Sequence, residues 1–89
     1  MNQFPKALRR LRKRYFGKQL ALADACSCSV PHISWLEGGK RCPSCAMLQK
    51  LRHALITAQV GEREIAELIR DAKAEIIHRR FGSGDAVQL

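Results

Sequence analysis

Four cysteines are the residues of this sequence best suited to chemistry, and they stand in two short spacings, Cys26-x-Cys28 and Cys42-x-x-Cys45. Four thiolates that converge on one point can hold a tetrahedral zinc ion. However, C-x-C is a poor half-site compared with C-x-x-C, and a free cysteine also behaves as a small apolar core residue. We expect the cysteines to be core residues and no metal or other cofactor to be bound. Zinc binding, and oxidant sensing by Cys42 and Cys45, stay open as alternatives.

No group of residues in the sequence suggests catalysis. None of the acidic residues is paired with a histidine at a recognisable spacing. Gly38-Gly39-Lys40 lacks both the first glycine and the preceding strand of a phosphate-binding loop. A chain of 89 residues buries only about 60–65% of its unfolded surface, which leaves little room for an enclosed substrate pocket. The sequence therefore predicts a protein that is not an enzyme.

Positive charge is concentrated in one part of the chain. The formal net charge is +8; residues 1–56 hold 11 basic and two acidic side chains, whereas residues 57–89 hold five and six. This asymmetry indicates a polyanionic partner for the N-terminal part and a different role for the remainder. Nucleic acid and an anionic membrane surface are the candidates, ahead of an acidic protein.

The cellular location can also be predicted from hydropathy. No apolar run approaches the roughly 20 residues that a bilayer-spanning helix needs. The charged N-terminal region lacks the apolar stretch of a signal peptide. We therefore expect a cytoplasmic protein in a reducing compartment, without a membrane partner.

The spacing of apolar residues predicts an all-α fold of five helices. Phe4, Leu8, Leu11 and Tyr15 define one face of a first helix, which Gly17 ends. A short second helix covers residues 18–25. A third begins after an N-cap at Ser29 and runs to Glu37, a fourth is capped by Ser44, and the longest covers residues 62–80. The expected inward residues of the second and fourth helices are Leu20, Leu22, Ala23, Met47, Leu48, Leu51 and Leu55.

Two short helices separated by the turn 26–29 suggest a helix-turn-helix. The motif comprises Gln19-Leu20-Ala21-Leu22-Ala23, then Ile33-Ser34-Trp35-Leu36-Glu37-Gly38-Gly39-Lys40-Arg41, then Pro43-Ser44. From about Lys6 to Leu55, the chain resembles the Cro/Xre-type family of phage and bacterial transcriptional repressors. The resemblance implies that the helix at 30–37 enters the major groove of a double-stranded DNA operator.

The resemblance also implies individual roles. Ile33 and Leu36 would face the core, Gln19 would brace the helix at 30–37, and Arg12 would pair with Glu37. Cys26 and Cys28 fall at core positions of the family. The expected DNA-contacting residues are Lys18, Gln19, Ser29, Val30, Pro31, His32, Ser34, Trp35, Lys40 and Arg41. A core position for Trp35 and an incidental surface position for His32 are the alternatives.

The sequence departs from the family pattern at two places. Val30-Pro31 stands where two polar residues are usual, which favours apolar contacts with thymine methyl groups over readout by an amide. Ser27 stands where glycine is usual. This substitution implies either a left-handed backbone at Ser27 or an altered turn.

The expected organisation is a DNA-binding core at residues 1–58, a C-terminal helix at 59–81 and a flexible tail at 82–89. The helix would join two copies through Ile65, Leu68, Ile69, Ala72 and Ile76. Packing of this stripe against the first helix of the same chain is the alternative, and the helix can serve both purposes. The predicted function is a homodimeric, sequence-specific repressor of a palindromic operator, autoregulatory and derived from a phage or mobile element. The alternative is an antitoxin that represses its own operon and binds a toxin through the C-terminal helix.

Overall fold

A computed structural model describes residues 3–81 of the chain, and the side chains of residues 3–77. Within that range the fold has five helices and no strand, which confirms the predicted all-α class. The predicted tail at residues 82–89 lies outside the described residues. The helices are α1 (Phe4–Tyr15), α2 (Gln19–Ala25), α3 (Val30–Glu37), α4 (Cys45–Thr57) and α5 (Glu62–Phe81).

The predicted helix ends are set by local hydrogen bonds. The hydroxyl of Ser29 accepts a hydrogen bond from the backbone N–H of His32 at 3.3 Å. The hydroxyl of Ser44 accepts one from the N–H of Met47 at 3.1 Å. Both bonds satisfy donors that a helix start leaves unpaired, so the predicted N-caps of α3 and α4 are confirmed. After α1, Gly17 adopts a left-handed conformation with φ of 83° and ends the helix as predicted.

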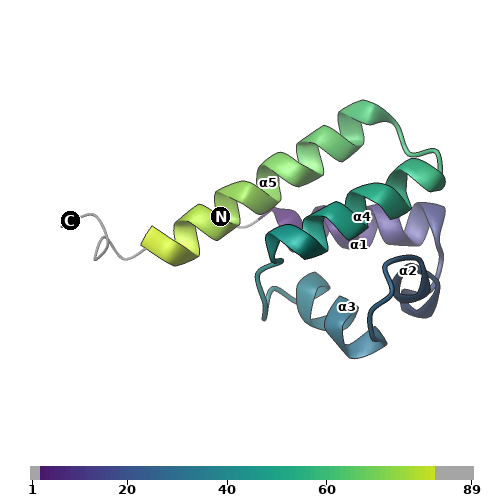
Figure 1. Ribbon diagram of the computed structural model, residues 1–89, viewed down its shortest axis with the longest axis horizontal. Coiled ribbons are helices and arrows are strands. Elements are labelled where there is room, and N and C mark those ends of the chain that lie inside the picture. The colour runs from purple at the N-terminus through teal and green to yellow at the C-terminus, as the bar shows by residue number, and fades with distance from the viewer. Residues whose placement is uncertain (1–2, 82–89) are drawn as a thin grey trace.

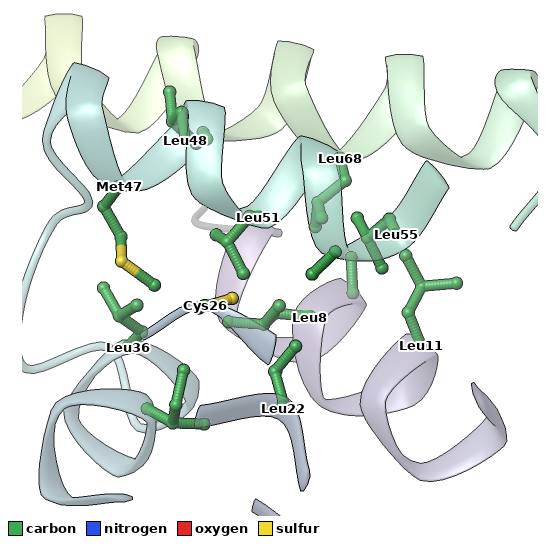
Figure 2. Close-up of a cluster of buried hydrophobic side chains, with 14 of the residues drawn as sticks. Leu8, Leu11, Leu22, Cys26, Leu36, Met47, Leu48, Leu51, Leu55 and Leu68 are labelled. Carbon is green, nitrogen blue, oxygen red and sulfur yellow. The ribbon is translucent and has the colours of Figure 1, made fainter. Parts of the chain in front are cut away.

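The helices pack around one apolar core. Figure 1 shows α4 lying between α5 on one side and the pair α2 and α3 on the other, and α1 packs against both α3 and α5. Figure 2 shows side chains from all of these helices meeting in that space. The fully buried side chains are Phe4, Leu8, Leu11, Leu22, Cys26, Ile33, Leu36, Leu51, Leu55 and Leu68. The predicted inner faces of α1 and α4 are therefore confirmed, with Tyr15 half-buried at the edge.

The prediction for Leu20 is wrong. Its side chain is 57% exposed, whereas Leu22 and Ala23 are buried as expected. Positions two residues apart on a helix point about 160° away from each other. Since Leu22 faces the core, Leu20 must face solvent.

For part of the predicted dimer face of α5, the alternative of packing within the same chain is confirmed. Ile65, Leu68 and Ala72 are buried within a single chain, because α5 lays this stripe against α1 and α4. These three residues are core residues and are not available to a second copy. Ile69 and Ile76 are only half-buried, so they remain accessible at the edge of the core.

The turn between α2 and α3 contains a strained residue. Ser27 has a φ of 55°, which decides between the two predicted alternatives in favour of the left-handed backbone. This conformation disfavours residues that have a Cβ atom. The turn is closed by the N–H of Cys28, which donates to the carbonyl of Ala23 at 2.9 Å.

We expect Ser27→Gly to stabilise the fold by about 0.5–1 kcal/mol. Relief of a left-handed residue contributes about 1–2 kcal/mol, and the greater freedom of glycine in the unfolded chain offsets part of it. Urea unfolding followed by circular dichroism measures the change. Ser27→Ala is the control, because it keeps the Cβ atom. Equal stabilities of the glycine and alanine variants would contradict strain at this turn.

Candidate nucleic-acid interface

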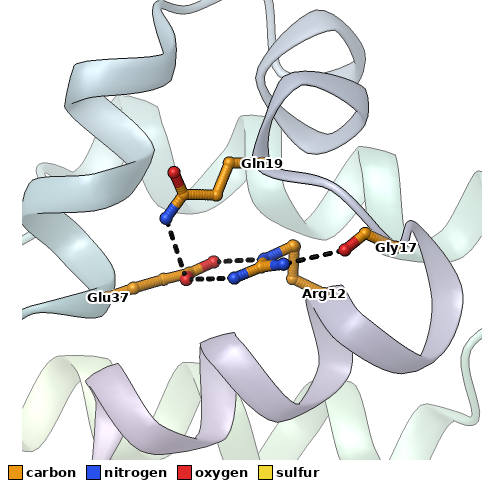
Figure 3. Close-up of polar contacts among 4 residues, drawn as sticks. All are labelled: Arg12, Gly17, Gln19 and Glu37. Carbon is orange, nitrogen blue, oxygen red and sulfur yellow. Dashed lines mark hydrogen bonds and ion pairs between the residues drawn. The ribbon is translucent and has the colours of Figure 1, made fainter.

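A buried ion pair joins α1 to the end of α3. The Nε and Nη2 atoms of Arg12 donate to the two carboxylate oxygens of Glu37, each at 2.8 Å (Figure 3). The two side chains are 10% and 4% exposed. Such a bidentate pair fixes orientation as well as distance, since the guanidinium and the carboxylate must be coplanar. The structure thus brings together the two residues predicted as a brace.

Two further hydrogen bonds extend this pair. Arg12 Nη1 donates to the carbonyl of Gly17 at 2.8 Å, at the turn that follows α1. Gln19 Nε2, from the first residue of α2, donates to Glu37 Oε1 at 3.2 Å. Gln19 therefore braces α3, as predicted, through a direct hydrogen bond to Glu37. Together these contacts, which we call the Glu37 network (Arg12, Gly17, Gln19 and Glu37), connect α1, α2 and α3.

The network also determines the ionisation of its members. Burial alone would raise the pKa of Glu37, but the hydrogen bonds from Arg12 and Gln19 and the nearby charges of Arg12 and Arg9 lower it below its ordinary value. The hydrogen bond to Glu37 raises the pKa of Arg12. Both groups are therefore charged at neutral pH.

The outward face of α3 carries the residues predicted to contact DNA. Ile33 and Leu36 point into the core as expected. Trp35 is 38% exposed, so the alternative of a core tryptophan is wrong. Ser29, Pro31 and Ser34 are also exposed, and Val30 and His32 are half-buried.

Trp35 and Arg41 form one unit. The Arg41 guanidinium lies over the indole ring at 4.5 Å from the ring centre, within the range of a cation–π contact. The His32 ring meets the indole edge-on, with centroids 6.5 Å apart. Hydrogen bonds from the N–H groups of Lys40 and Arg41 to the carbonyl of Trp35 turn the chain back toward α3. From the sequence, Trp35 and Arg41 were expected as separate contacts; their stacking depends on this turn.

The cationic residues predicted near α3 are accessible. Lys18, Lys40 and Arg41 are exposed, and Gln19 is half-buried in the Glu37 network. Lys18 is the N-cap residue of α2, and Lys40 and Arg41 follow the end of α3. Positive side chains thus stand at two ends of the α2–α3 pair, where they can contact phosphates on either side of a groove.

The cysteines divide between core and surface. Cys26 lies in the core, where burial raises the pKa of its thiol to about 11, and burial also raises the pKa of the half-buried Cys28. Cys45 is exposed at the start of α4, so the predicted core position is wrong for this cysteine. Cys26 therefore acts as an apolar core residue. Among the residues that the structure describes, no three side chains of histidine, cysteine, aspartate or glutamate gather into a group that could hold a metal ion.

Comparison of the chain with known protein families, with characterised proteins and with solved structures finds no match in any of the three. Across residues 3–81, none of the helices combines the length and the apolar character needed to cross a membrane.

We expect Glu37→Gln to destabilise the fold by about 3–5 kcal/mol, because the variant leaves the buried guanidinium of Arg12 without its counter-charge. Thermal unfolding gives the measurement, and Asp24→Asn is the control, since Asp24 is exposed on α2. A loss of about 1 kcal/mol lowers the melting temperature of a domain of this size by about 4–8 °C. Equal melting temperatures for the two variants would contradict the bracing role of the network.

The same pair predicts a pH dependence. Because the pKa of Glu37 is lowered on folding, its contribution is complete above the unfolded value of about 4.3 and is lost as the pH falls through the folded value. The difference in melting temperature between wild type and Glu37→Gln should therefore narrow as the pH drops from 6 toward about 3. A difference that stays constant over this range would show that ionised Glu37 contributes nothing.

Proposed function

We propose that this protein is a sequence-specific, DNA-binding transcriptional regulator of the helix-turn-helix type that acts as a repressor. The observation that supports this proposal best is that α3 is hydrogen-bonded to its neighbouring helices on one side and exposed to solvent on the other. Glu37 anchors the end of this helix to α1 and α2, while Trp35 and Ser34 face solvent. A helix held this rigidly on one side can present the other to a DNA groove without a large loss of conformational freedom on binding.

The dimensions and chemistry of α3 suit the major groove. With its side chains an α-helix is about 10–12 Å across, close to the width of the major groove of B-DNA. Ser34 can hydrogen-bond base edges, and Val30 and Pro31 can contact thymine methyl groups. Lys18 and Lys40 would contact phosphates and set the position of the helix. Trp35 would contribute its indole edge while holding Arg41 against its face.

A second copy of the chain would double the DNA site. One α3 reaches too few base pairs for specificity, and helix-turn-helix proteins commonly bind two half-sites as dimers. The accessible apolar surface lies in an open groove between α4 and α5 of about 910 Å³. Ile56 and Ile77, which are 53% and 58% exposed, border it together with the half-buried Ile69. We propose that the dimer interface lies at this groove, because the stripe of α5 that faces the core is buried within the chain.

The groove also supports a second candidate function. Arg52, Arg70 and Lys73 line it, against a single acidic residue, Glu62. An apolar floor with a basic edge suits an acidic protein partner, as expected of an antitoxin that binds a toxin while repressing its own operon. A complex with such a partner that blocks self-association would favour this candidate over the homodimer.

Selection of binding sites from a randomised duplex library tests the proposed function. We expect recovery of an inverted repeat, with an affinity whose logarithm falls against log salt with a slope on the order of −4 to −8 per dimer. Trp35→Ala and Arg41→Ala should weaken operator binding in a strongly non-additive way, because each removes one half of a stacked pair. Recovery of no common sequence would contradict sequence-specific binding.

The position of the dimer interface is tested by charge insertion. We expect Ile56→Asp combined with Ile77→Asp to give a monomer in sedimentation equilibrium, because two carboxylates would have to be buried in the interface. Leu20→Asp is the matched control, since Leu20 is equally exposed but lies on α2. Retention of the dimer by the double variant would exclude the groove as the interface.

A further inference from the structure

The outward face of α1 carries a second group of positive charges. It consists of five exposed side chains that recur every three or four residues along the helix: Lys6, Arg9, Arg10, Lys13 and Arg14. We call it the α1 face. No acidic residue occurs in α1, and none of the five forms an ion pair within residues 3–77. Apart from the nearby charge of Glu37 beside Arg9, their mutual repulsion is relieved by solvent and salt, or by an anionic partner.

Part of the α1 face points away from α3. Arg12 marks the direction of α3, because it is bonded to Glu37. At about 100° per residue, Arg10 and Arg14 lie about 160° around the helix from Arg12. Next to this flank, the Arg14 guanidinium lies over the Tyr15 ring at 5.5 Å, and the Tyr15 hydroxyl donates to Glu64 of α5 at 3.1 Å. Arg10 and Arg14 thus point away from α3, and Figure 1 shows α3 and α5 on opposite sides of the molecule.

This arrangement separates two basic surfaces. A duplex seated on α3 would meet Lys18, Lys40 and Arg41, which belong to the α2–α3 pair and the loop after it. The same segment of duplex cannot also reach side chains on the far flank of α1. The Glu37 network holds α1 and α3 in a fixed relation, so the two surfaces cannot rotate to face the same side.

The chemistry of the α1 face favours a nucleic-acid backbone over a lipid surface. Helices that lie in a membrane interface insert an apolar face, whereas Phe4, Leu8 and Leu11 are fully buried in the core. From Lys6 to Arg14 the face extends about 12 Å, a length over which duplex DNA carries about seven phosphate charges. The five cations approach this number of charges, and the apolar side of the helix is buried in the core, where it cannot enter a bilayer.

We propose that the flank of the α1 face around Arg10 and Arg14 is a second nucleic-acid site that binds the phosphate backbone of a duplex segment other than the one held by α3. Contact with phosphates positions a duplex without reading its sequence. The second segment is either a separate duplex, which the protein would bridge to the first, or a more distant part of the same DNA, which would bend around the protein. Binding of the first duplex segment at α3 rests on the proposed function, whereas the charge of the α1 face is observed independently of it.

A two-duplex capture assay tests this proposal. One 20-bp duplex of arbitrary sequence is immobilised, and a second, fluorescently labelled duplex of unrelated sequence is offered at about 50 mM salt. We expect wild type to capture the labelled duplex. Arg10→Gln combined with Arg14→Gln should reduce capture about tenfold, and should change the affinity for a single 20-bp duplex less than about threefold. The charge-matched control compares Arg10→Gln with Arg63→Gln, each of which removes one positive charge from an exposed side chain, Arg63 lying on α5.

The outcomes separate the possibilities. Loss of capture by the Arg10/Arg14 variant alone supports bridging, and a loss of affinity confined to a 60-bp duplex supports bending of one DNA. Equal effects of the variant on single-duplex affinity and on capture would overturn the proposal, as would unchanged capture. Binding of wild type to vesicles containing phosphatidylserine, lost in the variant and unaccompanied by capture, would identify a membrane surface instead. If wild type binds no duplex at all, the proposed function fails as well. Binding of one duplex without capture of the second overturns only the second site and leaves the proposed function intact.

Discussion

The fold depends on one buried carboxylate, Glu37, at the end of α3. It accepts two hydrogen bonds from Arg12 and one from Gln19, so a single side chain is bonded to both of the other N-terminal helices. A buried charge is tolerated only when partners compensate its lost hydration. The need to satisfy Glu37 therefore restricts how α1, α2 and α3 can be arranged. Apolar packing alone is less directional, because hydrophobic contacts tolerate sliding and rotation.

The arrangement of charge follows from this constraint. Of the six cations between Lys6 and Arg14, only Arg12 turns inward, where it meets the carboxylate. The others stay exposed, and with Lys18, Lys40 and Arg41 they form a surface that is positive on more than one side. Since the helices are held rigidly, these charges act as separate patches with defined directions. A repressor-like DNA contact at α3 and a second backbone contact at α1 are compatible with this geometry.

The C-terminal helix illustrates how a small domain uses its apolar residues. A chain of this size buries only part of its surface, so each helix that covers the core is needed there. α5 therefore uses Ile65, Leu68 and Ala72 within its own chain. The edge of that stripe stays accessible, and there Ile69 and Ile77 line the groove together with Ile56 of α4. An interface formed at this groove, as proposed above, would include α4 as well as α5.

Much of the fold could be predicted from the sequence, because helix periodicity, the caps at Ser29 and Ser44 and the stop at Gly17 are local properties of the chain. The inner faces of α1 and α4 and the pairing of Arg12 with Glu37 also agree with the sequence-based expectation. Only the tertiary structure could decide the features that depend on contacts between distant segments. It decides that Leu20 faces solvent, that part of α5 is core, that Arg41 stacks on Trp35, and that the cations of α1 divide between two directions. The physical reason is that a helical pattern determines which residues share a face, whereas the neighbouring elements determine which face is covered.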